Sequence, residues 1–475
     1  MKRLFRIWLR RAVAAMVLAA MAGCAARQAP PVQEPPAPPV TEIPSLPEAV
    51  PEVLLHVPQR VDQAVPLSDV PLLGLEEQVV LHEKALERFF APWSLQKTSI
   101  PAREAFWGTT AFGSRQGYAE NLQPYPKERW AGLVALQDMA AYPSMAAAAI
   151  VTRNTSVRVL PSNRPFFLNP ALPGEGFPFD YFQNSALWLG TPVFLSHASL
   201  DRSWLFVETA FTSGWVRRED VALTDETFRS RYRTRVMAAV LKDDTPLAEA
   251  GRYLGQAHIG AIFPLHSRTG QNLVVTVPLR DADGRAQMGL ASLGPQQAAA
   301  MPLPPTSRAV AGLADAMAGQ LYGWGGMFEN RDCSSTMRDL FLPFGIWLPR
   351  NSSQQARQGE QTVSLEGLQA EEKLAAIRIQ GKPFLTLIAM PGHIGLYLGT
   401  DSRGEPLLLH NIWGVRTVLP DGGEGRAVIG RLAISTLRPG EYRPDVREGA
   451  FLDRIRGLTV LGAGVAVGAR PRAAQ

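Results

Sequence analysis

One cysteine and two histidines in the C-terminal third of the chain have the residue types and the spacing that nucleophilic chemistry requires. Cys333 follows Asp332, a good N-cap residue, in NRDCSSTMRDLF, and apolar residues recur at helical spacing after it. Cys333 is therefore expected in the first turn of a helix, where the helix dipole favours a thiolate. Such a thiolate would attack an amide carbonyl, although a buried inert cysteine is the common alternative.

A nucleophilic thiol needs a base, and two histidines lie near neighbouring strand ends. His393 begins the run HIGLYLG after a Pro-Gly turn, and His410 ends the run LLLHN. The turn sequence DSRG at 401–404 predicts a hairpin that brings both imidazoles to its open end. His410 would then orient the ring of His393, the third role in a triad. The alternative for His393 is a structural histidine that caps a turn.

The other five histidines are scattered over the rest of the chain, at positions 56, 82, 197, 258 and 266. The other cysteine, Cys24, lies near the N-terminus, so the chain has no zinc-like spacing of cysteines and histidines. We therefore expect no metal and no cofactor.

The first 23 residues have the pattern of a secretory signal. Five basic residues precede an apolar run of about ten residues, too short to span a bilayer stably. Ala-Gly-Cys at 22–24 resembles a bacterial lipobox, so Cys24 is the expected lipid-bearing residue. The alternative is an ordinary cleaved signal with an incidental cysteine. Because Ala25 is not the Asp expected for inner-membrane retention, we expect a periplasmic protein anchored in the outer membrane.

Charge and composition exclude one class of partner. The formal net charge of +5 comes entirely from the five basic residues of 1–23, and no basic stripe follows. Nucleic-acid binding is therefore not expected. The hydrophobic content of 46% and the charged content of 19% are typical of a folded globular chain.

Composition also predicts the domain organisation. After the signal at 1–23, a Pro-rich stretch at 24–51 is expected to form a semi-extended tether. The remaining segments are a helical region at 52–150, two small all-β units at 151–228 and 229–305, an α+β domain at 306–450, and a loose tail at 451–475.

Apolar stripes at helical spacing predict the helices that support these units. One stripe begins the helical region, a second begins the α+β domain, and a third follows Cys333. Their members are Leu75, Val79, Leu86 and Phe89; Val310, Leu313, Met317 and Leu321; and Met337, Leu340, Phe341 and Phe344.

Four motifs resemble those of the NlpC-type cell-wall cysteine peptidases, which belong to the papain-like superfamily. They are YGWGG at 322–326, DCSS at 332–335, GHIGLYLG at 392–399 and LLHNIWG at 408–414. RFFAPWS at 88–94 and FDYFQNS at 179–185 extend the likeness to a multidomain subgroup, in which a helical N-terminal region and two bacterial SH3-like barrels precede the papain-like peptidase domain.

The resemblance implies hydrolysis of peptidoglycan stem peptides or muropeptides, between γ-D-glutamate and a diamino acid such as meso-diaminopimelate. It assigns Cys333 as nucleophile, His393 as base and His410 as the orienting residue, and we expect a monomer. Further residues would contact the substrate: Tyr322 near the oxyanion, Asp332 at the free amine of an N-terminal L-Ala, Ser335 where the family more often has Gly, and Tyr181 on a barrel loop that narrows the cleft.

Two rival functions remain open. In the first, the barrels anchor the protein to peptidoglycan and the C-terminal domain is an inactive scaffold. In the second, the C-terminal domain is an amidase or acyltransferase that acts on another amide, since papain-like sites also serve those reactions.

Overall fold

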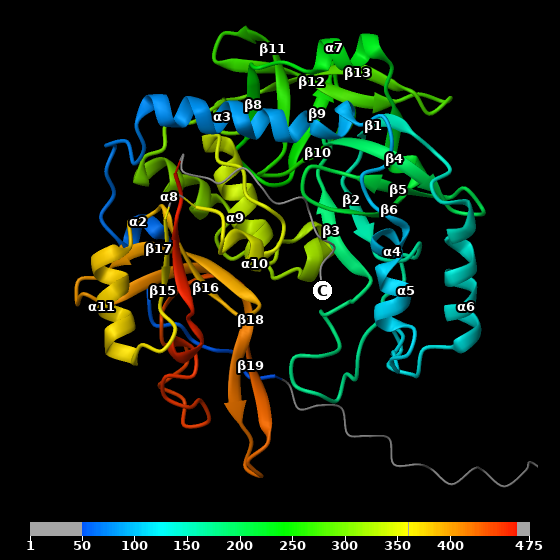
Figure 1. Ribbon diagram of the computed structural model, residues 1–475. Helices are drawn as coiled ribbons and strands as arrows, with labels where there is room; N and C mark the ends of the chain where they lie inside the picture. Colours follow the sequence, from blue (N-terminus) through cyan, green and yellow to red (C-terminus); the bar gives the residue numbers. More distant parts are fainter. Residues whose placement is uncertain (1–49, 360, 463–475) are drawn as a thin grey trace, which may run out of the picture. The chain divides into compact units, whose positions relative to one another are not determined.

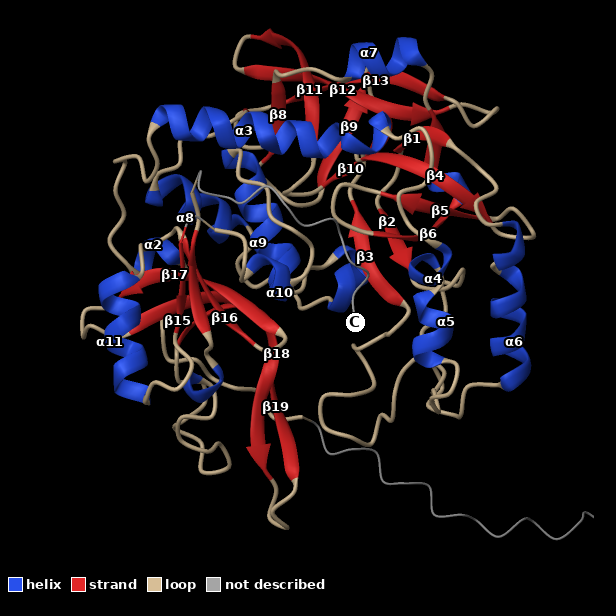
Figure 2. Cartoon of the chain, viewed as in Figure 1, coloured by secondary structure: helices blue, strands red, loops and turns tan. Residues whose placement is uncertain are grey.

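The computed structural model describes residues 50–359 and 361–462, in which the strands form four sheets (Figures 1 and 2). The predicted signal, most of the tether and Cys24 lie outside the described residues. Among the residues described, no helix is long and apolar enough to cross a membrane.

The predicted helical N-terminal region is confirmed, but its helices do not share a core of their own. They are α2 (Val61–Ala64), α3 (Leu75–Phe90), α4 (Ala102–Ala105), α5 (Trp107–Phe112) and α6 (Lys127–Leu136). Helix α2 packs into the core around α9, α3 packs beside the second barrel, and the aromatic residues of α5 pack on the first barrel.

The face of α3 that we predicted to be buried is partly wrong. Leu75 and Val79 are exposed, whereas Leu86 is buried as predicted, together with Leu81 and Ala85. The buried face is shifted because the side chain of Gln78 points into the protein. Its amide donates to the backbone oxygens of Leu303 and Phe344.

The first barrel is a seven-stranded antiparallel sheet of strand order β3-β2-β6-β5-β4-β1-β7. It begins at Ala147, so the predicted boundary at 151 is four residues late. Its strands are β1 (Ala147–Val151), β2 (Thr155–Arg158), β3 (Gln183–Leu187), β4 (Pro192–Ala198), β5 (Trp204–Glu208), β6 (Ser213–Arg217) and β7 (Val221–Leu223).

The second barrel follows helix α7 (Glu226–Tyr232) and combines a five-stranded and a two-stranded antiparallel sheet. Strands β12 and β13 pair as a hairpin, and the turn between them contains Asp283 and Gly284. The strands are β8 (Met237–Val240), β9 (Thr245–Glu249), β10 (Arg252–Ala257), β11 (Ile262–Thr269), β12 (Asn272–Arg280), β13 (Ala286–Leu293) and β14 (Ala298–Ala300).

The C-terminal domain has the predicted α+β order, with a six-stranded sheet of order β15-β20-β16-β17-β18-β19. Its helices are α8 (Ser307–Ala316), α9 (Cys333–Phe341), α10 (Ser352–Gln355) and α11 (Ala370–Gln380). Its strands are β15 (Gln361–Ser364), β16 (Thr386–Met390), β17 (His393–Thr400), β18 (Pro406–Val418), β19 (Glu424–Thr436) and β20 (Gly457–Val460).

Two sequence-based expectations for this domain need correction. The segment 451–475 is not simply a loose tail, because β20 lies inside the sheet and pairs with both β15 and β16. His410 does not end its strand either, since β18 continues to Val418 and pairs with β19 along this length. The predicted hairpin of β17 and β18, with its turn at 401–405, is present.

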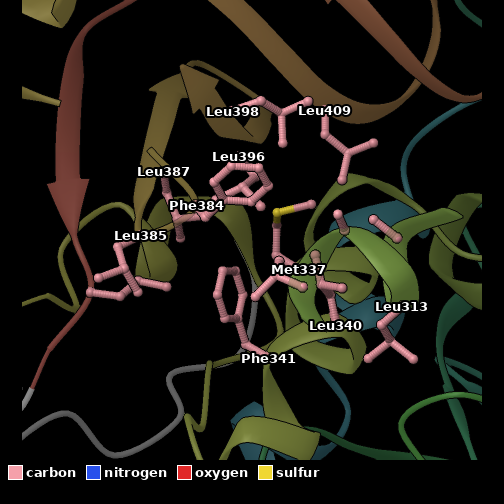
Figure 3. Packing of buried hydrophobic residues seen from close by; sticks show 14 of the residues in the cluster. Leu313, Met337, Leu340, Phe341, Phe384, Leu385, Leu387, Leu396, Leu398 and Leu409 are labelled. Atoms are coloured by element: carbon pink, nitrogen blue, oxygen red, sulfur yellow. The ribbon is translucent and has the colours of Figure 1, made fainter. Parts of the chain in front are cut away.

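The core beneath Cys333 places helix α9 against the sheet (Figure 3). Met337, Leu340 and Phe341 of α9 are fully buried and pack in one cluster with sheet residues such as Leu396. Leu321, in contrast, is exposed because α8 ends at Ala316, five residues before it. Helix α9 is thus anchored along its apolar face.

Candidate active site

Cys333 is the first residue of α9, and the local sequence explains why the helix starts there. The Asp332 side chain accepts from Ser335 N (2.9 Å), while Ser335 Oγ accepts from Asp332 N (2.9 Å), which is a capping box. The Ser335 hydroxyl, which we expected beside the substrate, is therefore occupied within the cap.

The Asp332 carboxylate is also neutralised by a buried arginine. Arg350 makes a bidentate pair with it (2.6 and 3.1 Å), and Gly325 N donates to the same group (3.2 Å). Burial alone would raise the pKa of Asp332, but the Arg350 guanidinium holds it below its ordinary value. Arg350 thus compensates the Asp332 charge, and the binding of a substrate amine by Asp332 stays a prediction.

The sulfur of Cys333 is enclosed, with only 7% of the residue exposed. Burial, followed by the charge of Asp332, raises the pKa of Cys333 to about 12, although the backbone N–H groups of Ile394 and Ser334 oppose the rise. The expectation of a resting thiolate is therefore wrong for this enclosed site. Desolvation and a neighbouring carboxylate outweigh the helix dipole.

The contact with Ile394 N–H brings the start of β17, and with it His393, to the sulfur. Burial, with a smaller contribution from Arg454, lowers the pKa of His393 to about 3. Burial and then His393 lower the pKa of His410 well below its usual value. Burial thus favours the thiol of Cys333 and the neutral forms of both imidazoles.

Hydrogen bonds define which nitrogen of each imidazole carries the proton. Ser435 Oγ donates to Thr436 O (2.7 Å), so it accepts from His410 Nε2, 3.0 Å away. His410 Nδ1 is then an acceptor and takes the proton of His393 Nε2 at 2.9 Å. His393 Nδ1 is consequently left with a free lone pair, as a base requires. Sequence reasoning missed Ser435, which lies 25 residues from His410 and in no recognised motif.

Tyr322 lies near Cys333 and Asp332. Its backbone N–H donates to Gly430 O (2.8 Å), which fixes the residue against β19. Burial, and then the proximity of Cys333 and Asp332, raises the pKa of the Tyr322 phenol well above its ordinary value. The hydroxyl therefore keeps its proton and can donate to a developing oxyanion.

Known domains match along most of the chain. The N-terminal NLPC_P60 stabilising domain matches 13–142, an SH3 domain of SH3b1 type 165–217, an SH3 domain of SH3b2 type 225–269, and the NlpC/P60 family 319–412. Among solved structures, an NlpC/P60 endopeptidase from Photobacterium damselae subsp. piscicida is similar, with 25% identity, a TM-score of 0.77, and coverage of 87% of this chain and 99% of that one. The C-terminal domain is an NlpC/P60 domain.

A second structure, an NlpC/P60 family protein from Bacillus cereus ATCC 10987, shares 16% identity with a TM-score of 0.43, over 66% of this chain and 99% of its own. No curated protein matches the chain. The family match and the fold identify a cysteine peptidase of the cell-wall type, whose SH3-like domains are consistent with peptidoglycan binding.

In this NlpC/P60 peptidase, a loop of the first barrel packs against the residues that flank the site. Phe179 places its ring 5.2 Å from Trp324 and 6.0 Å from Trp413, between ring centroids, in edge-on geometry. Tyr181 lies 6.1 Å from Trp324 and its hydroxyl donates to Glu175. Sequence reasoning found this loop through Tyr181 but missed Phe179, the residue that makes most of the contacts.

Asp180, next to Tyr181, has a structural position in the first barrel. Its carboxylate pairs with Arg158 (2.8 Å) and accepts from the backbone N–H groups of Phe166 and Phe182. It thereby shapes the loop that carries Phe179.

The described residues contain no group of three or more His, Cys, Asp or Glu side chains able to hold a metal ion.

Proposed function

We propose that this NlpC/P60 peptidase is a peptidoglycan stem-peptide endopeptidase. It hydrolyses the amide between γ-D-glutamate and a diamino acid such as meso-diaminopimelate, with Cys333 as nucleophile, His393 as base and His410 as the orienting residue. The observation that carries the proposal is the hydrogen-bonded chain from Ser435 through His410 to His393, which leaves His393 Nδ1 as the free basic nitrogen.

The reaction begins with concerted proton transfer. His393 Nδ1 takes the proton of the Cys333 thiol while the sulfur attacks the γ-glutamyl carbonyl carbon, so no resting thiolate is required. The backbone N–H of Cys333 and the Tyr322 hydroxyl donate to the oxyanion. The protonated His393 then gives its proton to the leaving amine as the C–N bond breaks, and a thioester remains.

Hydrolysis of the thioester completes the cycle. His393 removes a proton from water, the hydroxide attacks the thioester carbonyl, and the C–S bond breaks. The sulfur recovers its proton from His393, and the product is a γ-glutamyl carboxylic acid. Tyr181, beside Trp324 at the barrel loop, would contact the bound peptide.

Muropeptide digestion followed by mass spectrometry tests the proposal. The wild-type protein should release a free diamino-acid amine and a γ-glutamyl acid, and Cys333→Ala should release neither while keeping the fold. Retention of turnover by Cys333→Ala would defeat the assignment of the nucleophile. Products cut at another amide would favour the amidase or acyltransferase alternative, and absence of turnover in the wild type would favour the scaffold.

The same proposal places the protein in the periplasm, held by a lipid on Cys24, with the outer membrane as its location. Mass spectrometry of the mature N-terminus from cells that express the full chain, compared with Cys24→Ser, tests this placement. An unmodified N-terminus in the wild type would contradict it.

A further inference from the structure

The loop that carries Tyr322 toward Cys333 has an unusual backbone. Its central part is the short 3₁₀ segment η4 (Trp324–Glu329), in which four residues have left-handed φ angles: Gly325, Gly326, Phe328 and Glu329. Phe328 (φ 56°) and Glu329 (φ 61°) are not glycines, and side chains disfavour this conformation. Such a conformation persists only when the surroundings hold it in place.

A single carboxylate oxygen of this loop is held by both barrels. Glu329 Oε2 lies 2.6 Å from His258 Nε2 of the second barrel and accepts from Asn154 Nδ2 of the first barrel at 2.8 Å. The side-chain oxygen Oδ1 of Asn154 in turn accepts from Leu189 N (3.0 Å), which fixes the side-chain amide. Although burial favours a neutral imidazole, hydrogen bonds to Asp243 and Glu329 raise the pKa of His258 to about 9.

The first barrel also contacts the loop at the level of its backbone. Gln183 Nε2 donates to Gly325 O (3.0 Å), and a Cβ atom at Gly325 would lie 2.5 Å from Gln183 O. A Cβ atom at Gly326 would lie 2.6 Å from that of Ala186. The loop therefore packs so closely against β3 that neither glycine has room for a side chain.

The contact of Glu329 with His258 lies away from the proposed catalytic residues. His258 and Glu329 line a cavity of about 510 Å³ whose lining residues include neither Cys333 nor His393. An influence of this pair on Cys333 or His393 would therefore have to pass through the loop backbone.

We propose that the contact of Glu329 with His258 and Asn154 positions the loop 323–331 for catalysis, so that both barrels are parts of the active site. The contact holds the left-handed backbone that sets the Tyr322 hydroxyl at the oxyanion position. This inference rests on the proposed roles of Cys333 and Tyr322, and it gives the barrels a task beyond binding the wall.

The test uses the full-length protein and a short soluble stem peptide, which needs no anchoring to the wall. Glu329→Ala removes both contacts and should lower kcat at least about tenfold with KM changed by less than about twofold, because an oxyanion donor acts in the transition state. Glu329→Gln keeps an oxygen that can accept from both donors and should retain kcat within about threefold. His266→Gln, exposed on the second barrel, is the matched control and should match the wild type.

A second variant keeps the test decisive if Glu329→Ala fails to fold. Asn154→Asp preserves the acceptor for Leu189 N but sets a carboxylate against Glu329, and it should also lower kcat with KM unchanged. An unchanged kcat in a folded Glu329→Ala or Asn154→Asp protein, or equal losses in Glu329→Ala and Glu329→Gln, would overturn the inference. Failure of the proposed function is seen separately, as turnover by Cys333→Ala.

Discussion

The two sides of the active site are held by different means. The base side consists of His393, His410 and Ser435, which lie on the adjacent strands β17, β18 and β19 of one sheet. The loop side consists of Tyr322 and the residues 323–331, which form an irregular segment held by side chains of two other domains.

The two sides therefore differ in what holds their residues in place: one sheet on the base side, and contacts between domains on the loop side. On the base side, the backbone ladder fixes the strands, so a side chain can change without moving its neighbours. On the loop side, the backbone conformation itself depends on contacts across domain boundaries. Substitutions on the base side should therefore change the chemistry alone, while those on the loop side should change how the domains support it.

The largest expected effect lies on the base side, at the proposed base. His393→Gln removes the free basic nitrogen and should lower kcat by roughly 10³- to 10⁴-fold, as loss of a triad member does. Because β17 keeps its ladder, the far-UV circular dichroism and the melting temperature should stay close to those of the wild type.

His266→Gln, an exposed histidine substitution, serves as the control for this comparison. A His393→Gln protein with kcat within about tenfold of the wild type would remove His393 from the mechanism.

The next effect concerns Arg350, which joins helix α9 to the first barrel. Its guanidinium pairs with Asp332, and its Nε donates to Ser185 Oγ of β3 (2.8 Å). Arg350→Met leaves the buried Asp332 carboxylate without its partner and should lower the free energy of unfolding by about 3–5 kcal/mol. Urea denaturation measures this loss.

Arg103→Met, on a side chain that is 86% exposed, should change the unfolding free energy by less than about 0.5 kcal/mol. If Arg350→Met proved no more destabilising than this control, the buried pair would not stabilise the junction of helix and barrel.

The sequence predicted the parts of the site that depend on nearby residues. The start of α9 at Cys333 follows from Asp332 directly before it and from the apolar spacing after it. The meeting of His393 with His410 follows from one hairpin with a short turn. Both are local patterns, and both are present in the structure.

The parts that escaped prediction depend on distant segments. The protonation state of Cys333 reflects chiefly its burial by the whole domain, which no local pattern reveals. Strand β20 lies inside the sheet although its sequence resembles a tail. The contact of His258 with Glu329 joins residues 71 positions apart, so a histidine that seemed scattered lies beside the loop of the active site.

On the loop side, that contact should make stability depend on alkaline pH. His258 has a folded pKa of about 9 against an ordinary 6.5, and it faces Asp243, Asp244, Glu329 and Arg331. Because the folded state holds the proton more tightly, the stabilisation is complete below pH 6.5 and is lost as pH rises through 9. The shift corresponds to at most about 3 kcal/mol.

Chemical denaturation at several pH values measures this dependence, with His258→Gln as the comparison. The stability of the wild type should fall more steeply than that of His258→Gln between pH 6.5 and pH 9. Parallel curves would show that the imidazole is not held in its charged form by these carboxylates.

The smallest effect returns to the base side, at Ser435. Its hydroxyl accepts from His410 Nε2, and this bond selects the form of His410 that accepts from His393. Ser435→Ala removes the acceptor, so His410 can carry its proton on Nδ1 and donate toward His393 Nε2. His393 Nδ1 would then hold a proton in part of the molecules, and kcat should fall about tenfold with KM unchanged.

Ser435→Thr keeps the hydroxyl and should restore most of the rate, which separates the loss of the hydrogen bond from a packing defect. Proton NMR of the imidazole N–H groups should show the wild-type pattern in Ser435→Thr and a mixture in Ser435→Ala. A Ser435→Ala protein with wild-type kcat would mean that the strand ladder alone orients both rings. The base side would then depend on side-chain contacts even less than the comparison with the loop side suggests.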